Sequence, residues 1–209
     1  FIYDLTSNVG GVDADGVDLS VSYQMPETNY GLFGVRFDAA FLSNYDKTLS
    51  TGAVIKHAGE FKDNDDGNFP DLKFTLGINW MSGDWSANYT GRYIDEVHED
   101  LTKWFSVAGE SRMVDSQFVH DIQASYNFSE YNSTLTFGID NVGDEQPPFA
   151  YSGFNDNTDP RTYDTRGRYK YMHEHRNFHA NNRRTEFTVD NLQPAHYIIA
   201  PHGAAICAS

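Results

Sequence analysis

The sequence predicts an all-β protein, an antiparallel meander that forms part of a transmembrane β-barrel. Three observations support this prediction. Apolar and polar residues alternate with period 2 through much of the 209-residue chain. The links between the alternating segments are short and long in turn. Aromatic residues, which favour strands, make up 15% of the chain and gather toward both ends of the segments.

Six segments alternate clearly, and each predicts a strand that is apolar on one face only. In the first segment, Val17 and Leu19 alternate with Asp18. A seventh segment begins near Asp164 and is legible to about Met172. The six clear segments are Gly16–Gln24, Gly31–Tyr45, Asp71–Met81, Trp85–Ile94, Phe118–Phe128 and Ser133–Asn141.

The links have a regular order along the chain. Short turns follow the first, third and fifth segments, whereas long links follow the second, fourth and sixth, at residues 46–70, 95–115 and 142–163. An antiparallel meander with this order has all its tight turns at one end and all its long loops at the other. Outer-membrane barrels typically show this asymmetry, with short periplasmic turns and long extracellular loops.

Aromatic and charged residues lie on different phases of the predicted strands. Aromatic residues of the apolar phase form two belts, as expected of a wall that faces lipid. The belt beside the tight turns holds Tyr23, Phe33, Trp80, Trp85, Tyr126 and Phe128, and the belt near the long links holds Tyr45, Tyr93 and Phe118. The charged residues of the other phase, which we expect to face the lumen, are Arg36, Asp38, Lys73, Arg92, Asp121 and Asp140. His120 is an exception on the apolar phase, near the long-link end.

Composition excludes several classes of protein. The chain has 30 acidic and 15 basic residues and a net charge of −15, which argues against binding to nucleic acid or to an anionic membrane surface through a basic patch. The single Cys207 rules out an intramolecular disulfide bond. No apolar run approaches the roughly 20 residues of a membrane-spanning helix. A soluble β-sandwich stays open as an alternative, because its buried face would alternate in the same way.

Several motifs resemble those of TonB-dependent outer-membrane receptors. Asn-Val-Gly-Gly at 8–11 with Gly-Val-Asp-Leu at 16–19 is similar to one strand of that family. The segment 136–148 looks like the family's penultimate strand, in which an Asn ends the strand and an acidic residue and Pro follow. Tyr-Asp-Thr-Arg-Gly-Arg at 163–168 resembles the start of the final strand. The resemblance covers about residues 1–172.

The resemblance implies about seven strands from the C-terminal part of a barrel of about 22 strands. Such receptors import scarce nutrients, for example ferric siderophores, cobalamin or oligosaccharides, across the Gram-negative outer membrane. The resemblance further implies membrane lipid as a partner, a small-molecule or oligosaccharide substrate, and TonB engaged through an upstream plug that is absent here. No catalysis, cofactor or metal is expected. Substrate selection would lie in the long loops, where aromatic residues could stack on a ligand or brace the loop: Phe149, Tyr151, Phe154 and Tyr163.

Residues 173–209 differ from the rest of the chain. The alternation stops after Met172, acidic and basic residues balance, and five of the eight His lie in this segment. The chain also ends at Ser209 without the terminal aromatic residue that family members usually have. We therefore expect a barrel portion at 1–172 and an irregular tail at 173–209 that is not native to the family, produced by a shifted reading frame or an incorrect gene boundary.

Two other functions stay open at this point. One is a soluble acidic β-domain that binds carbohydrate. The other is a β-fold glycoside hydrolase, for which the acidic pairs 95–96 and 99–100 could supply two carboxylates. The acidic segment 63–68 has part of the spacing of a calcium loop but lacks the Glu that follows in such loops. The cluster His173, Glu174, His175 and His179 lacks a periodic scaffold for a metal site.

Overall fold

A computed structural model describes the chain over residues 10–63, 67–100, 111–153, 157–176, 188–190, 196–199 and 205–208. Across these ranges the regular structure is β-strand, apart from one turn of 3-10 helix at Ser129–Tyr131. No helix in these ranges is long and apolar enough to cross a membrane. The prediction of an all-β chain is therefore confirmed.

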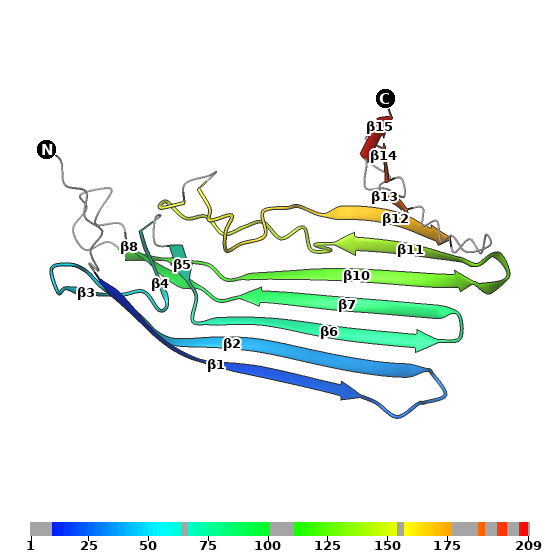
Figure 1. Cartoon of the computed structure of the whole chain (residues 1–209), viewed down its shortest axis with the longest axis horizontal. Helices are drawn as coiled ribbons and strands as arrows, with labels where there is room; N and C mark the ends of the chain where they lie inside the picture. The colour runs from blue at the N-terminus through cyan, green and yellow to red at the C-terminus, as the bar shows by residue number, and fades with distance from the viewer. Residues whose placement is uncertain are drawn as a thin grey trace, which may run out of the picture.

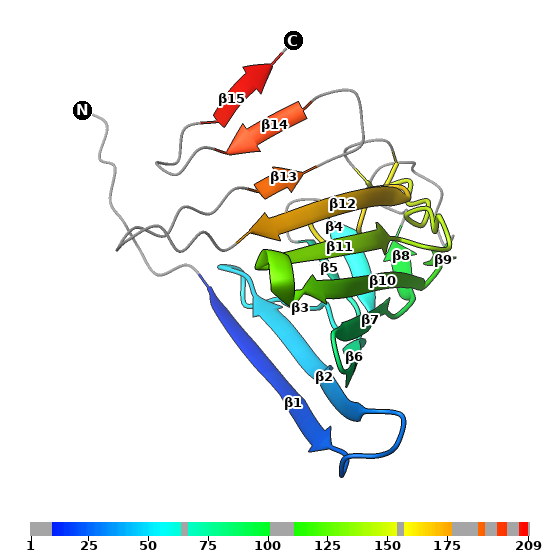
Figure 2. The same cartoon turned by 90° about the vertical axis from the view of Figure 1, so that its right-hand side faces the viewer.

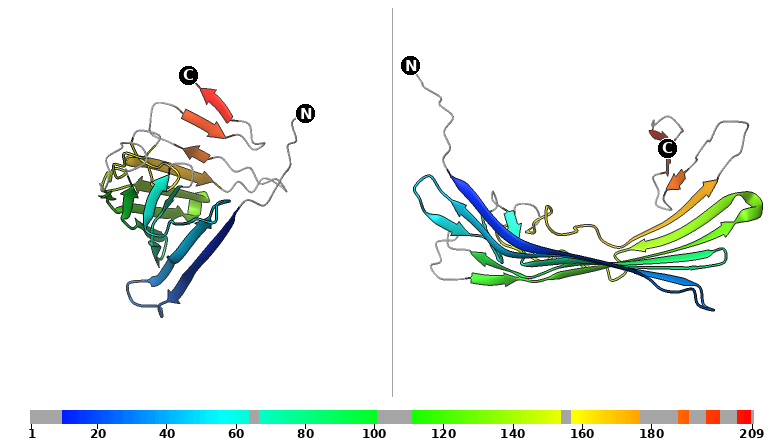
Figure 3. Two further views of the ribbon diagram at one scale, coloured as in Figure 1. Left: turned by 90° about the vertical axis from the view of Figure 1, so that its left-hand side faces the viewer. Right: turned by 60° about the horizontal axis from the view of Figure 1, so that its bottom comes forward.

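Most strands belong to one large antiparallel sheet, the main sheet (Figure 1). Its strands pair in chain order, and the short β3 (Val54–Lys56) pairs with the end of β2. The meander prediction is confirmed, and β1 and β12 form the two edges, which lie apart in Figure 2. Figure 3 shows that the sheet is curved and twisted. The paired strands are β1 (Gly11–Gln24), β2 (Leu32–Thr48), β6 (Leu72–Ser82), β7 (Trp85–Ile94), β10 (Gln117–Phe128), β11 (Ser133–Asp140) and β12 (Tyr169–Arg176).

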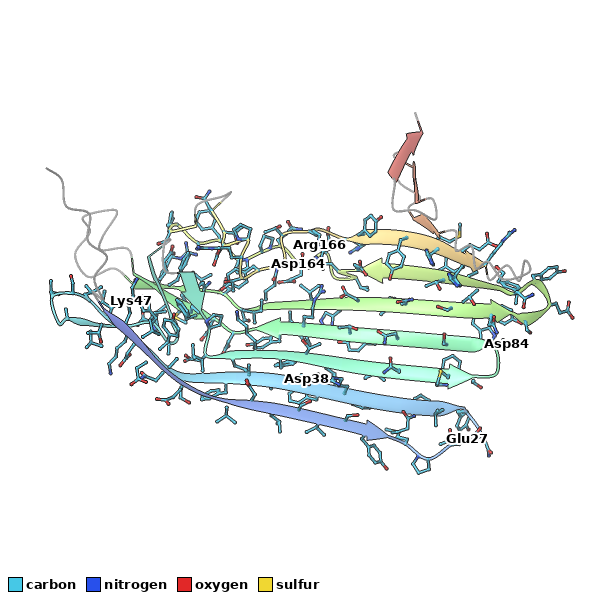
Figure 4. The ribbon with its side chains drawn as sticks, in the orientation of Figure 1. Glu27, Asp38, Lys47, Asp84, Asp164 and Arg166 are labelled. Carbon is cyan, nitrogen blue, oxygen red and sulfur yellow. The ribbon has the colours of Figure 1, made fainter. Side chains whose placement is uncertain are left out.

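The tight turns and the long links lie at opposite ends of the main sheet, as the sequence predicts. In Figure 4, Glu27 and Asp84 mark the tight-turn end and Lys47 marks the long-link end. The link between β6 and β7 is only Gly83 and Asp84, and Gly83 has a φ of 57°, which a two-residue hairpin turn requires.

A second sheet lies at the long-link end (Figure 1). It contains β4 (Glu60–Asp63), β5 (Gly67–Phe69), β8 (Val97–Asp100) and β9 (Ser111–Val114), in the order β5-β4-β8-β9. β4 and β8 pair in parallel, so this sheet joins the first long link to the second. The described parts of these two links are therefore held together by backbone pairing.

The two faces of the main sheet differ as the alternation predicts. The register places Asp38, Thr75 and Arg92 in one row across β2, β6 and β7. We call this side the polar face and the opposite side the apolar face. Val17 is 64% exposed and Ile122 is 43% exposed on the apolar face. Residues packed between two sheets would be buried, so the sandwich alternative is wrong.

One irregularity changes the predicted phase at the end of β2. The register between β1 and β2 shifts between Asp15 and Gly16, and it leaves Ser43 without a partner. An extra residue reverses the alternation beyond it. Tyr45 was expected in the aromatic belt of the apolar phase, but it stacks on Phe69 of β5, with ring centroids 4.3 Å apart. That expectation is corrected.

His120, the polar residue predicted on the apolar face, has a hydrogen-bonding partner there. The Nδ1 atom of His120 lies 2.7 Å from the hydroxyl oxygen of Tyr89. Gly91 is directly opposite His120 in the register, and a Cβ atom at Gly91 would lie 2.8 Å from that hydroxyl. The glycine thus leaves room for the hydrogen bond, which reduces the cost of placing an imidazole on this face.

The last strand of the main sheet differs from its prediction at both ends. β12 begins at Tyr169 and not near Asp164, because the backbone N–H of Arg166 bonds to the Asp164 carboxylate in a local turn. It continues to Arg176 and not to Met172, because β11 offers an open backbone edge along its whole length.

Part of the predicted tail is therefore strand. β13 (Thr188–Asp190), β14 (His196–Ile199) and β15 (Ala205–Ala208) form a separate antiparallel sheet. The division of the chain into a barrel portion at 1–172 and an irregular tail at 173–209 that is not native to the family stays a prediction. The origin of the segment in a shifted reading frame stays a prediction.

The side chains of β12 depart from the pattern of the other strands, since only Met172 keeps an apolar residue on the apolar face. Lys170 and Glu174 pair with Ile139 and Leu135 of β11, so they lie on the apolar face. Tyr171 pairs with Gly138 on the polar face, where a Cβ atom at Gly138 would lie 2.1 Å from the Tyr171 ring. The contact of the ring with the bare glycine backbone favours this register.

Candidate functional site

The three long links pack together at one end of the main sheet and form what we call the loop assembly (residues 46–63, 67–70, 95–100, 111–115, 142–153 and 157–163). Its core contains one apolar residue from each of β4, β8 and β9 and two from the third link, and each is at most 2% exposed. These residues are Phe61, Val97, Val114, Ala150 and Tyr163. Residues far apart in the chain thus share one small core, which holds the links in a fixed arrangement.

A buried carboxylate joins two of the links. Glu99 of β8 is 0% exposed, and its Oε1 atom accepts a hydrogen bond from the backbone N–H of Ser152. The Nε atom of Arg112 lies 4.0 Å from the Oε2 atom of Glu99. Burial of a charge is costly unless it is paired and hydrogen-bonded, so these contacts offset only part of its desolvation, because Oε2 accepts no hydrogen bond from the described residues. Glu99 was considered for a catalytic pair, but here it anchors the third link to the second.

Arg112 also contacts two exposed aromatic rings. Its guanidinium carbon lies 5.4 Å from the ring centroid of Phe149 and 5.0 Å from that of Tyr151. The two rings are 4.9 Å apart at 89° to each other, and they are 46% and 50% exposed. Both distances suit cation–π attraction. We call these three residues the aromatic platform.

The predicted substrate-loop residues thus divide into two kinds. Phe149 and Tyr151 come together on the surface, where they could contact a ligand. Tyr163 is buried, and its hydroxyl oxygen accepts a hydrogen bond from Nδ2 of Asn68 at 3.0 Å. Burial raises the pKa of Tyr163 to about 12, and the residue braces the loop assembly. Phe154 lies outside the described residues.

Charged residues of the polar face form a network next to the loop assembly. The Nη2 atom of Arg92 lies 3.1 Å from Oδ2 of Asp121 and 3.1 Å from Oδ2 of Asp164. Asp164 also pairs with Arg166 at 3.2 Å, and Figure 4 shows these two residues side by side. Burial raises the pKa of Asp164, but the hydrogen bonds and charge of Arg166, with the charge of Arg92, outweigh it and hold the pKa below its usual value.

The six predicted lumen residues are only partly brought together. Asp140 lies within range of the charges of Asp121, Arg166 and Arg92 but makes no ion pair that the described residues show. The backbone N–H of its neighbour Asn141 bonds to the Asp121 carboxylate at 2.8 Å. Arg36 and Asp38 form a separate ion pair at 2.6 Å, further along the polar face. Lys73 is on the same face and is attracted to Asp159 of the third link.

A cavity of about 510 Å³ opens beside this network. It is lined by Asp140, Asn141, Asp164, Arg166, Gly167, Arg168 and Tyr169. Asn141 shapes its floor, since the amide of Asn141 donates to the carbonyl oxygens of Glu145 and Arg166 at 2.9 and 3.1 Å. Sequence reasoning noted this Asn only as the end of a strand. The sequence signal for the hydrogen-bonding role of Asn141 was its position directly before a turn that contains an acidic residue.

No metal site is apparent in the part of the chain that the structure describes, where no group of three or more His, Cys, Asp or Glu could hold an ion. The acidic segment 63–68, considered for calcium, lies partly outside the described residues.

Like Asn141, Arg112 was not identified as a site residue from the sequence, because the long links carry no periodic pattern that predicts which of their side chains meet.

One of three comparisons with known proteins gives a match. The family model described as TonB dependent receptor-like, beta-barrel, matches residues 2–142. No curated protein and no solved structure matches the chain.

Proposed function

Because the chain belongs to the TonB-dependent receptor-like β-barrel family, a family of outer-membrane receptors and transporters, we propose that it serves TonB-energised uptake of a scarce nutrient across a Gram-negative outer membrane. The nutrient would be a siderophore–iron complex, a cobalamin or an oligosaccharide. TonB would act through a plug that lies upstream of this chain in the parent receptor.

The observation that carries this proposal is the exposed apolar face of the main sheet. Val17, Leu19 and Phe41 are each more than half exposed, at 64%, 52% and 51%. An apolar surface of this extent in water costs roughly 25 cal/mol for each Å². Lipid removes that cost, and the tight turns and long links then take the periplasmic and outer sides.

The polar face would then line the lumen, with Arg36, Asp38, Lys73, Arg92, Asp121 and Asp140 directed into it. The ion pairs of Arg92 with Asp121 and Asp164 support this assignment, since paired charges suit a water-filled or protein-filled interior. The network also ties the third long link to the barrel wall, so the outer loops would be held over the lumen.

The aromatic platform is the part of the loop assembly best suited to meet the nutrient first. Phe149 and Tyr151 offer exposed ring faces, and Arg112 adds a cation held in place by the buried Glu99. Glu99 is bonded to Ser152 and inaccessible, which gives no support to a catalytic carboxylate pair. Uptake without catalysis is the function that these contacts favour.

The proposal is tested by fractionation and growth. The protein should be recovered in the outer-membrane fraction, and deletion of its gene should abolish growth on one limiting nutrient from a panel of iron complexes, cobalamins and oligosaccharides. Loss of TonB should give the same defect. Recovery in the soluble fraction, or growth unaffected by loss of TonB, would refute it.

The platform is tested in the same strain. The double substitution Phe149→Ala and Tyr151→Ala should weaken nutrient binding by about tenfold or more, since stacked rings contribute about 0.5–1.5 kcal/mol each. Tyr131→Ala is the matched control, because Tyr131 is 75% exposed in a tight turn at the opposite end of the main sheet. Equal loss in both proteins would remove the platform from the binding site.

A further inference from the structure

We propose that the apolar face of the main sheet carries a specific site for an anionic lipid, in which a groove holds an acyl chain and Lys170 holds the phosphate. The inference rests on the outer-membrane location proposed above. It concerns the outside of the wall, on the opposite side of the main sheet from the polar face.

The groove lies where two small residues interrupt a row of large ones. The register aligns Trp80, Ala87, Ala124 and Phe137 across β6, β7, β10 and β11. The two alanines leave a hollow of about 470 Å³ between the indole and the phenyl ring. A groove with apolar walls and a floor of small side chains suits a flexible hydrocarbon chain.

The groove continues toward the tight turns. A second hollow of about 360 Å³ shares Ala124 and Phe137 with the first and extends to Trp85 and Tyr126. The two hollows together run along the strands, which is the direction of an acyl chain lying against a barrel wall. On this face the described strands β6, β7, β10 and β11 present no Asp, Glu, Lys or Arg side chain.

A cation without an ion pair among the described residues lies at the edge of this groove, whereas Arg176 on the same face is paired with Glu174. Lys170 of β12 pairs with Ile139, which lines the groove, and its side chain is exposed on the same face. Glu174 on that face pairs with Arg176 at 2.5 Å, whereas no ion pair is found for Lys170 among the described residues. An unpaired ammonium on a lipid-facing wall is costly unless an anion meets it.

The position of Lys170 identifies that anion as a lipid headgroup. It is the second residue of β12, which begins at the long-link end, so it lies toward the outer boundary of the apolar face. A lysine at this level can extend its ammonium to the interface. There, the phosphate of a lipid whose chain fills the groove would neutralise it.

The test uses quenching of Trp80 and Trp85 by lipids with brominated acyl chains. The full chain, with Trp104→Phe to remove the third indole, is titrated in mixed micelles with brominated phosphatidylglycerol or phosphatidylcholine. We expect quenching by the anionic lipid at about fivefold lower concentration, as one lysine near a phosphate predicts. Lys170→Gln should remove the preference, and Lys170→Arg should keep it.

Matched variants separate the two parts of the site. Lys56→Gln makes the same charge change on β3 and should leave the preference intact. Ala124→Leu should fill the groove and reduce quenching by both lipids. If Lys170→Gln misfolds, the preference of the parent protein should still fall with added salt.

The outcomes distinguish this inference from the proposed function. Equal quenching by the two lipids in the parent protein, or a preference that survives Lys170→Gln, would overturn the lipid site and leave the membrane location standing. Absence of quenching by either lipid would overturn both.

Discussion

The apolar side chains of the main sheet and those of the loop assembly lie in opposite environments. Val17 and Ile122 of the main sheet are 64% and 43% exposed, whereas Phe61 and Val114 of the loop assembly are fully buried. The main sheet is held by backbone pairing along long strands, and its apolar side chains point outward. The loop assembly is held by a small core of the kind found in water-soluble domains. One chain therefore contains a part suited to lipid and a part suited to water.

This comparison predicts that the same substitution has very different effects in the two regions. Phe61→Ala should destabilise the loop assembly by about 3–5 kcal/mol, because it removes a buried ring and leaves a cavity. Phe41→Ala, on the apolar face at 51% exposure, should cost less than about 1 kcal/mol. Hydrogen exchange of the β4 and β8 amides measures the first effect.

The backbone amides of the main sheet should keep their slow hydrogen exchange in both the Phe61→Ala and the Phe41→Ala variants. If Phe61→Ala also released the amides of β6 and β7, the loop assembly and the main sheet would form one cooperative unit, and the contrast between them would fail.

Charge placed on the two faces of one strand should sharpen the comparison further. Ile78→Arg puts a cation on the apolar face of β6 and should cost up to about 2–4 kcal/mol in lipid. The adjacent Asn79→Arg puts the same cation on the polar face and should cost little. Urea titrations of the protein folded in vesicles give both values. Similar costs at the two positions would contradict the assignment of lipid and lumen sides.

The main sheet was predictable because each of its strands has one apolar face, so period 2 is visible in the residues themselves. Tight turns such as Gly83-Asp84 then fixed the pairing of neighbours. The phase error at Tyr45 arose because Ser43 is an extra residue in the β1–β2 register, and no residue type marks such a bulge. β12 could not be read correctly because its charged residues lie on the apolar face.

The loop assembly was less predictable for a different reason. Its parallel pairing of Glu60 with His98 joins segments separated by two strands of the main sheet, and local patterns carry no information about such contacts. The contacts of Arg112 and the burial of Glu99 depend on that pairing. Aromatic content alone identified Phe149, Tyr151 and Tyr163 as candidates, but it could not distinguish an exposed ring from a buried one.

The anchor between two links gives a smaller and more local effect. Glu99→Ala should destabilise the loop assembly by about 1–3 kcal/mol, because the buried backbone N–H of Ser152 loses its acceptor. Glu99→Gln keeps a carbonyl oxygen for that N–H and should cost less. Protease cleavage within residues 142–163 reports the difference. Equal cleavage of the two variants would mean that the charge, and not the hydrogen bond, stabilises this contact.

The smallest effect should come from pH. Burial raises the pKa of Tyr163 from 10.0 to about 12, so the folded loop assembly favours the neutral phenol. The stabilisation that depends on the buried neutral phenol is complete below pH 10, which is the pKa of Tyr163 in the unfolded chain. It is lost as the pH rises through about 12, the pKa in the folded chain. At pH 11 the loss should be about 1 kcal/mol. Hydrogen exchange of the β4 and β8 amides between pH 9 and pH 11 should show this loosening beyond the intrinsic rise in rate, whereas Tyr163→Phe should show none. A tyrosinate absorbance band that titrates fully near pH 10 would instead mean that Tyr163 is open to water and does not brace the links.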